Sequence, residues 1–276
     1  MKPLILLPTV HWRHESLAAM LEVLGKQTVA PWVRVIVDMT GIQQNGIHED
    51  EVFDGHADEF AREHWPKGLV GEIVKGGGSR AQCARWWHVE QAAPDQIVMT
   101  LDDDLIIDEH YVERTLDAYN RIRDRMNEAA HYGGELQPEE FALSWGGVDR
   151  FYRWRHYYDV FDDACELVVP QTGLMCFRAG IWCGVGDTPA ALHNYGHRRN
   201  GNEEVPLCVF AQEHGIRFFR PAGCIAKPHR LAFDDRSVSR TTQWNLRALL
   251  DWSVEHTSWK HAKAYRDLLD GKVPRP

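Results

Sequence analysis

The sequence lacks long apolar segments, because no run approaches the roughly 18 residues that a membrane-spanning helix requires. The apolar stretch 3–8 is interrupted by prolines and is too short for a signal peptide, so we expect it to form the first strand of a sheet. The six cysteines include no Cys-x-x-Cys pair. Together with the missing secretion signal, this predicts reduced, mostly buried thiols and a cytoplasmic protein without a membrane span.

Positive charge is scarce as well. The 31 lysines and arginines are outnumbered by 40 aspartates and glutamates, which gives a net charge of −9 and a pI near 5.9. This balance argues against a general nucleic-acid binder, although Arg150, Arg153 and Arg155 form a local basic cluster. The His-Glu-x-x-His pattern of zinc proteases is absent, so we expect no zinc site of that kind.

Tryptophan, by contrast, is abundant, with 11 residues in a chain of 276. Its rings commonly serve the core, but an excess also suits stacking against sugar or base rings. Trp145, Trp154 and Trp182 lie in the aromatic-rich second half of the chain. We expect these three to be the tryptophans available for stacking on a substrate.

Strand and helix patterns alternate along the first hundred residues. This order favours an α/β fold with a mostly parallel sheet and helices on both faces. The second half has shorter strand patterns between aromatic-rich loops, and then two C-terminal helices. The expected strands are 3–10, 33–38, 69–74, 97–101, 141–145, 166–169, 174–177 and 216–220, and the expected helices are 15–27, 49–64, 79–91, 108–130, 203–214, 241–255 and 258–269.

Three consecutive carboxylates, Asp102, Asp103 and Asp104, directly follow the apolar strand 97–101. Such a strand delivers the triplet to the carboxyl edge of a parallel sheet, where open α/β folds bind their ligands. Asp102 and Asp104 share one side of an extended chain. Two carboxylates beside a cleft suit Mg²⁺ or Mn²⁺ carrying a phosphate-bearing substrate. The alternative interpretation is a solvated acidic turn that caps the next helix.

Two further segments suggest a ligand site. The glycine triplet 76–78 resembles a phosphate-binding loop, but it lacks the lysine of a P-loop and the spacing of a dinucleotide fingerprint. We interpret it as a flexible loop, with Arg80 or Arg85 reaching a phosphate or a carboxylate. Glu203 and Glu204 lie at the start of an apolar helix, where they are either a favourable acidic first turn or functional carboxylates.

In this order the motifs resemble those of the GT-A fold glycosyltransferases, above all the large inverting (family 2-like) nucleotide-sugar transferases. The resemblance covers roughly residues 4–230. The corresponding segments are Pro8-Thr9 at the end of the first strand, the strand 33–38 ending in Asp38, the glycine loop with Arg80, the Asp-x-Asp motif at 101–104, the strand 173–178, the pair Glu203-Glu204, and the segment 225–229 ending in His229.

The resemblance implies a metal-dependent enzyme that moves one sugar from a nucleotide-diphosphate sugar to an acceptor hydroxyl with inversion. A divalent cation, Mn²⁺ or Mg²⁺, would neutralise the charge that grows on the leaving diphosphate. Glu204 is the implied general base, although the family usually has Asp there, and Glu203 is the alternative. The implied metal ligands are Asp102, Asp104 and His229, and the implied donor contacts are Pro8, Thr9, Asp38, Gly77, Arg80, Arg85, Asp102 and Asp103.

The expected domain organisation is a GT-A domain over 1–230, followed by a C-terminal loop and helical appendage over 231–276. Residues 1–107 would form the nucleotide-sugar-binding half and residues 108–230 the acceptor half. The acceptor is expected to be a saccharide, with a modified DNA base as the alternative because of the arginine cluster. Two other functions stay open: a sugar nucleotidyltransferase, whose usual Gly-x-Gly-Thr-Arg loop is absent after the first strand, and a non-catalytic carbohydrate-binding protein on the same scaffold.

Overall fold

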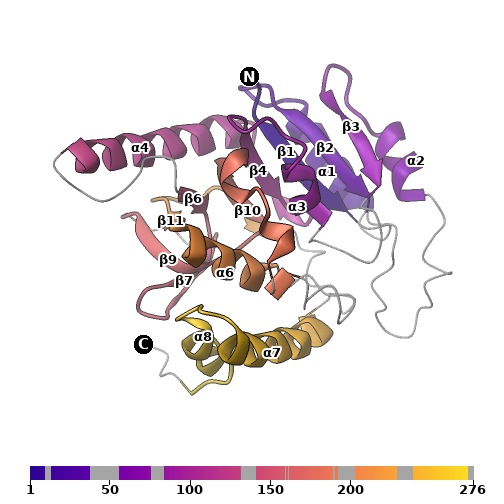
Figure 1. Cartoon of the computed structure of the whole chain (residues 1–276). Helices are drawn as coiled ribbons and strands as arrows, with labels where there is room; N and C mark the ends of the chain where they lie inside the picture. The colour runs from indigo at the N-terminus through magenta and orange to yellow at the C-terminus, as the bar shows by residue number, and fades with distance from the viewer. Residues whose placement is uncertain are drawn as a thin grey trace.

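The computed structural model describes residues 1–9, 14–37, 56–75, 84–131, 141–158, 160, 162–188, 190–191, 203–228 and 239–272. Its central feature is a sheet of ten strands with the order β3-β2-β1-β4-β10-β6-β11-β9-β7-β8. Helices pack on both faces of this sheet (Figure 1). The expected α/β class is therefore confirmed.

The first four strands form the parallel part of the sheet. They are β1 (Leu4–Thr9), β2 (Trp32–Val37), β3 (Val70–Lys75) and β4 (Ile97–Leu101). β1 lies in the middle and pairs in parallel with both β2 and β4, while β3 extends the sheet beyond β2. Because parallel strands end at one edge, the last residue of β1 and the residues that follow β4 lie close together there. The bounds agree with the expected strands to within one residue.

Beyond β4 the sheet becomes mixed, because β10 joins β4 in the antiparallel direction. β10 also pairs antiparallel with β6, which pairs in parallel with β11. The sequence pattern missed four short strands, β5, β7, β8 and β12. Of these, β5 and β12 pair with each other in a separate two-stranded sheet. The remaining bounds are β5 (Leu105–Ile106), β6 (Phe141–Ser144), β7 (Gly147–Asp149), β8 (Trp154–Arg155), β9 (Cys165–Pro170), β10 (Leu174–Arg178), β11 (Arg217–Arg220) and β12 (Lys227–Pro228).

Alternating side chains of the buried strands serve two separate cores. In β1, Ile5 and Leu7 belong to the core beneath α1 (His14–Leu24), α2 (His56–Glu63) and α4 (Tyr111–His131), whereas Leu4 and Leu6 belong to the opposite core. This period of two follows from the pleat of the strand. The opposite core is covered by α3 (Ala84–Val89), α6 (Glu204–His214), α7 (Ser239–His256), α8 (Ala262–Leu269) and two short 3-10 turns, η3 (Ala179–Trp182) and η4 (Val185–Asp187).

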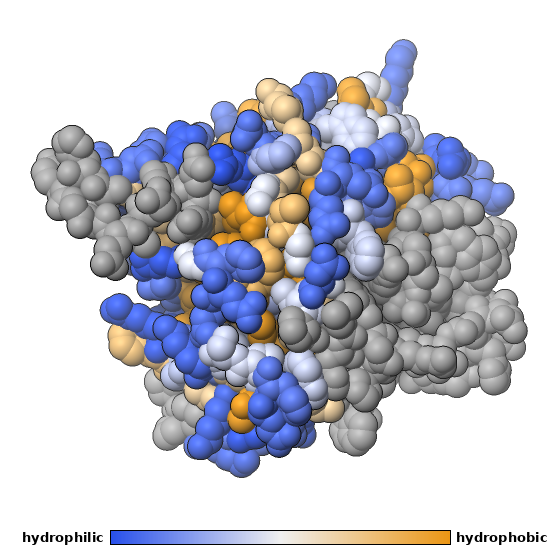
Figure 2. Space-filling model, in the orientation of Figure 1, coloured by the Kyte–Doolittle hydropathy of each residue, from blue (hydrophilic) through white to orange (hydrophobic). Residues whose placement is uncertain are grey.

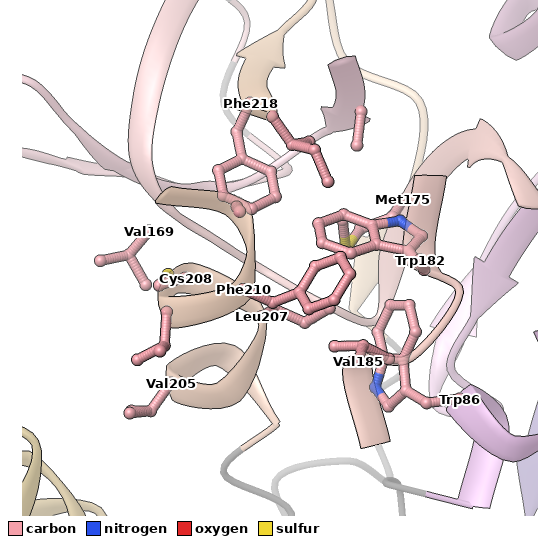
Figure 3. Close-up of a cluster of buried hydrophobic side chains, with 14 of the residues drawn as sticks. Trp86, Val169, Met175, Trp182, Val185, Val205, Leu207, Cys208, Phe210 and Phe218 are labelled. Atoms are coloured by element: carbon pink, nitrogen blue, oxygen red, sulfur yellow. The ribbon is translucent and has the colours of Figure 1, made fainter. Parts of the chain in front are cut away.

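Aromatic rings fill the space between α6 and the sheet, as Figure 3 shows. Trp182 is fully buried there, stacked on Phe218 at a ring-centroid distance of 5.9 Å and edge-on to Trp86 at 6.0 Å. Trp145 is also buried, in the other core. The expectation that Trp145 and Trp182 are available for stacking on a substrate is therefore wrong, because both rings are buried in the core. Only Trp154 of the three is exposed.

The surface agrees with the acidic, polar composition. Hydrophilic residues cover most of the described surface in Figure 2, and hydrophobic residues show only in smaller areas between them. Among the described helices, none is both long and apolar enough to cross a membrane. The five cysteines at described positions, residues 165, 176, 183, 208 and 224, are free thiols.

Candidate active site

The carboxyl ends of β1 and β4 meet at the aspartate triplet. The last residue of β1, Thr9, donates a hydrogen bond from Oγ1 to Oδ2 of Asp103 over 2.6 Å. Asp103 is 1% exposed, so its carboxylate points into the protein. This hydrogen bond joins the two strand ends and leaves Asp102 and Asp104, on either side of Asp103, as the partly exposed members of the triplet.

Asp102 is seated against a glycine. Its backbone N–H donates to the carbonyl of Gly173, just before β10, over 3.0 Å. A Cβ atom on Gly173 would lie 2.0 Å from Oδ2 of Asp102, which is closer than two non-bonded atoms can approach. The missing side chain at position 173 therefore provides the space that the carboxylate of Asp102 occupies.

The guanidinium of Arg85, at the start of α3, is fully buried and joins two carboxylates. Its Nη2 atom lies 2.7 Å from Oδ1 of Asp102 and 3.3 Å from Oε1 of Glu203. Its Nη1 atom donates to the carbonyl of Thr172 over 3.1 Å. Of the two partners that the sequence left open for Arg85, a phosphate or a carboxylate, the structure shows carboxylates.

Glu203 is enclosed by α3. Its Oε2 atom accepts a hydrogen bond from Nε1 of Trp86 over 2.5 Å, and 1% of its surface is exposed. Burial raises the pKa of Glu203 to about 7, although the charge of Arg85 opposes the rise. A carboxylate held in this way by a cation and an indole N–H is positioned rigidly.

Glu204, the first residue of α6, is half-buried and differs from its neighbour. Burial and the charge of Glu203 raise the pKa of Glu204 to about 8. A general base works best when its pKa lies near the operating pH, and paired carboxylates commonly reach such values. The pair therefore combines an enclosed member with a partly exposed one.

Asp104 lies where two distant segments approach the triplet. It directly precedes β5, which pairs with β12 so that Leu105 is opposite Pro228. Tyr157, in the loop after β8, packs against the core that contains Leu105. Burial is the main cause of a raised pKa of the Tyr157 hydroxyl, and the negative charges of Asp104 and Asp102 raise this pKa further. Residues from both halves of the chain thus meet at this edge.

Solved structures provide the comparison for this arrangement. The chain is similar to GalNAc-T7, in a crystal structure with UDP, GalNAc and Mn²⁺, with 10% sequence identity and a TM-score of 0.54 over 97% of this chain and 50% of that chain. It is also similar to S. aureus TarS in complex with UDP-GlcNAc, with 13% identity and a TM-score of 0.50 over 99% of this chain and 71% of that chain. The chain has the GT-A fold of glycosyltransferases. No family model and no curated protein matches the sequence, and the chain spans half the length of GalNAc-T7.

Within this GT-A fold, the structure brings most of the expected site residues to one edge. Thr9, Arg85, Asp102, Asp103, Asp104, Glu203 and Glu204 lie there as described, and Pro8 is buried in β1 opposite Ile36 of β2. Asp38, Gly77, Arg80 and His229 lie outside the described residues. Among the described residues, no three His, Cys, Asp or Glu side chains are grouped closely enough to hold a metal ion.

Four residues of this site were not among those expected from the sequence. They are Trp86, Gly173 and Tyr157, which contact or adjoin the expected carboxylates, and Thr172, whose carbonyl accepts a hydrogen bond from Arg85. The signal for Gly173 was present, since it starts the strand that was matched to the family. The other three carry no local signal, because their roles depend on partners that are far away in the sequence.

Proposed function

We propose that this protein is a glycosyltransferase that moves a sugar from a nucleotide-diphosphate donor to an acceptor hydroxyl with inversion. The observation that carries the proposal is the aspartate triplet at the carboxyl edge of β4, cross-linked by Arg85 to Glu203, in a GT-A fold. The structures of GalNAc-T7 with UDP and Mn²⁺ and of TarS with UDP-GlcNAc support this class of donor.

We assign Asp104 to a divalent cation, Mn²⁺ or Mg²⁺. Such ions are commonly held by one or two carboxylates together with substrate phosphates, so the donor set at this edge fits the ion. His229 is the proposed second ligand, and the β5–β12 pairing supports it because β12 ends directly before position 229 and β5 starts directly after Asp104. When bound, the cation would stabilise charge on the diphosphate leaving group.

Asp102 and Arg85 would act together on the donor side. Because Arg85 holds one oxygen of Asp102 at 2.7 Å, the carboxylate has a set orientation at the edge of the sheet. We assign Asp102 to hydroxyl groups of the donor sugar or ribose. A side chain oriented by packing and a second contact loses little entropy when it binds a substrate.

Glu204 is the proposed general base, and Glu203 is a positioning residue. A base must reach the proton of the acceptor hydroxyl, and of the pair only Glu204 is partly exposed. Glu203 faces Trp86 and Arg85 instead, and its charge raises the pKa of Glu204. This division of roles retains the assignment that the resemblance implied.

Donor binding provides the test. A panel of UDP- and GDP-sugars is added to the full chain with and without Mn²⁺, and the melting temperature is measured, because a ligand that binds only the folded state stabilises it. We expect at least one donor to raise the melting temperature only when Mn²⁺ is present. Asp104→Asn should remove this shift, whereas Asp108→Asn, four residues further along at an exposed position, should retain it. An unshifted wild-type protein, or an undiminished shift in Asp104→Asn, would contradict the assignment.

A further inference from the structure

Exposed apolar side chains gather in one short segment next to the candidate active site. Among the described residues, nine large hydrophobic side chains are exposed, and four of them, Phe151, Trp154, Tyr158 and Val160, lie between positions 151 and 160. Trp154 and Tyr158 are each 43% exposed. Large apolar groups concentrated on a polar surface commonly mark a binding site.

Three rings of this segment are aligned. The rings of Trp154 and His156 are 10° from parallel with centroids 6.5 Å apart, and those of His156 and Tyr158 are 6° from parallel at 5.0 Å. We refer to Trp154, His156 and Tyr158 as the aromatic row. Both ring pairs are stacked, so His156 lies between Trp154 and Tyr158, and these two end rings are exposed to solvent.

Two buried residues, Arg220 and Tyr265, hold the aromatic row in place. The fully buried Arg220 donates to the carbonyl of His156 over 3.5 Å and to those of Pro221 and Gly223 over 2.9 and 3.2 Å. The ring of Tyr265 in α8 packs edge-on against Trp154 at 6.1 Å. A surface whose backbone and rings are already ordered loses little entropy on binding.

The same segment reaches the candidate active site. Tyr157 lies within the aromatic row's sequence and contacts Tyr158 edge-on at 5.2 Å, while it packs on the core beside β5. The loop 221–226 that Arg220 ties to His156 continues into β12, which pairs with β5 next to Asp104. The aromatic row therefore extends from the edge at which transfer would occur.

Charge distinguishes the classes of ligand. The buried Asp149 accepts hydrogen bonds from Arg153 and Arg155, at 3.2 and 2.7 Å, so two of the three arginines in the basic cluster are ion-paired. Two exposed carboxylates, Asp162 and Asp163, follow the row in the sequence. A polyanion such as DNA needs a surplus of positive charge, which this segment lacks. A neutral sugar ring, by contrast, offers an apolar C–H face to an aromatic surface.

We propose that the aromatic row is the acceptor subsite, and that it binds a neutral saccharide by stacking. The role of this site as an acceptor subsite rests on the proposed glycosyl transfer. Saccharide binding to the aromatic row can be measured without any transfer. It also identifies the acceptor class that the sequence left open, a carbohydrate rather than a modified DNA base.

Binding of the full-length chain to an array of neutral oligosaccharides, with a DNA duplex as a further probe, tests this subsite. We expect the wild-type protein to bind at least one oligosaccharide, and Trp154→Ala and Tyr158→Ala to weaken that binding at least about fivefold, the effect of losing roughly 1 kcal/mol of ring contact. Tyr158→Phe keeps the ring and should retain the binding. Phe151→Ala removes an exposed ring outside the aromatic row and should also retain it.

Three results would overturn the proposal: no oligosaccharide bound by the wild type, equal binding by the alanine variants, or tighter binding of the duplex than of any oligosaccharide. If Trp154→Ala does not fold, the Tyr158→Ala and Tyr158→Phe pair decides, because Tyr158 has no core contact with α8 comparable to that of Trp154. Donor binding by the wild type distinguishes failure of the proposed function from failure of the proposed subsite. Its absence contradicts the proposed function, whereas its presence together with unaltered saccharide binding in the variants contradicts only the subsite.

Discussion

The buried guanidinium of Arg85 provides the sharpest prediction. It is the cation for two carboxylates, at 2.7 Å from Asp102 and 3.3 Å from Glu203. Arg85→Met keeps the apolar stem but removes the charge, and breaking a buried ion pair by removing one partner typically costs about 3–5 kcal/mol. Since a domain is commonly stable by about 5–15 kcal/mol, the variant should remain folded but lose a large part of its stability.

This loss should depend on pH. The pKa of Glu203 is about 7, so at pH 8 the carboxylate is ionised and needs its cation. At pH 5.5 Glu203 is protonated in both proteins and the ion pair with Arg85 is already absent. The remaining cost is then that of the hydrogen bonds to Asp102 and to the carbonyl of Thr172, roughly 1.5–3 kcal/mol for bonds that involve charged groups. We therefore expect the free energy of unfolding to differ less between wild type and variant at pH 5.5 than at pH 8.

Urea unfolding of four proteins measures both quantities. The set is wild type, Arg85→Met, Glu203→Gln and the double variant, each at the two pH values. In the Glu203→Gln background, Arg85→Met should cost less than in the wild type, because no carboxylate at position 203 is left without a cation. An equal cost at both pH values, together with additive effects of the two substitutions, would show that Arg85 and Glu203 are not coupled and would refute this account of the site.

Two further predictions concern the space around Asp102 and the proposed base. Gly173→Ala places a Cβ 2.0 Å from the carboxylate of Asp102 and should abolish the metal-dependent shift in melting temperature that the donor causes. Gly186→Ala, whose new Cβ has no atom within 4 Å, should leave this shift unchanged. Equal shifts in the two variants would contradict the steric argument. Glu204→Gln should lower transfer by roughly 10²–10⁴-fold, and wild-type transfer should fall as the pH drops below about 8, because protonation removes the base. If Glu203→Gln gives the larger loss and the pH profile stays flat in this range, the base has been assigned to the wrong residue.

The strands of the parallel half could be predicted from the sequence because their signals are local. The length, flanking residues and β-branched content of apolar runs such as Ile97–Leu101 indicate buried strands, and the order of strands and helices favours an α/β sheet. For the same reason Asp102, Asp103 and Asp104 could be placed at the carboxyl edge of β4. The order of these motifs also carried the resemblance to the GT-A fold glycosyltransferases.

The partners within the site were decided by the tertiary structure alone. Asp103 is hydrogen-bonded to Thr9, which lies 94 positions earlier, and Trp86 is hydrogen-bonded to Glu203, which lies 117 positions later. Nothing in the local sequence around an aspartate or a tryptophan specifies a partner at such a separation. Likewise β5 and β12 are two residues long, and each becomes a strand only because the other is beside it.

The same limit explains the tryptophans. Trp154 and Trp182 are the same residue type, yet one is 43% exposed and the other is fully buried. The sequence determined that the second half of the chain carries an excess of large rings. Which rings fill the core and which face solvent depends on how α6, η3 and β11 pack around Trp182, because burial is a property of the assembled elements and not of the residue.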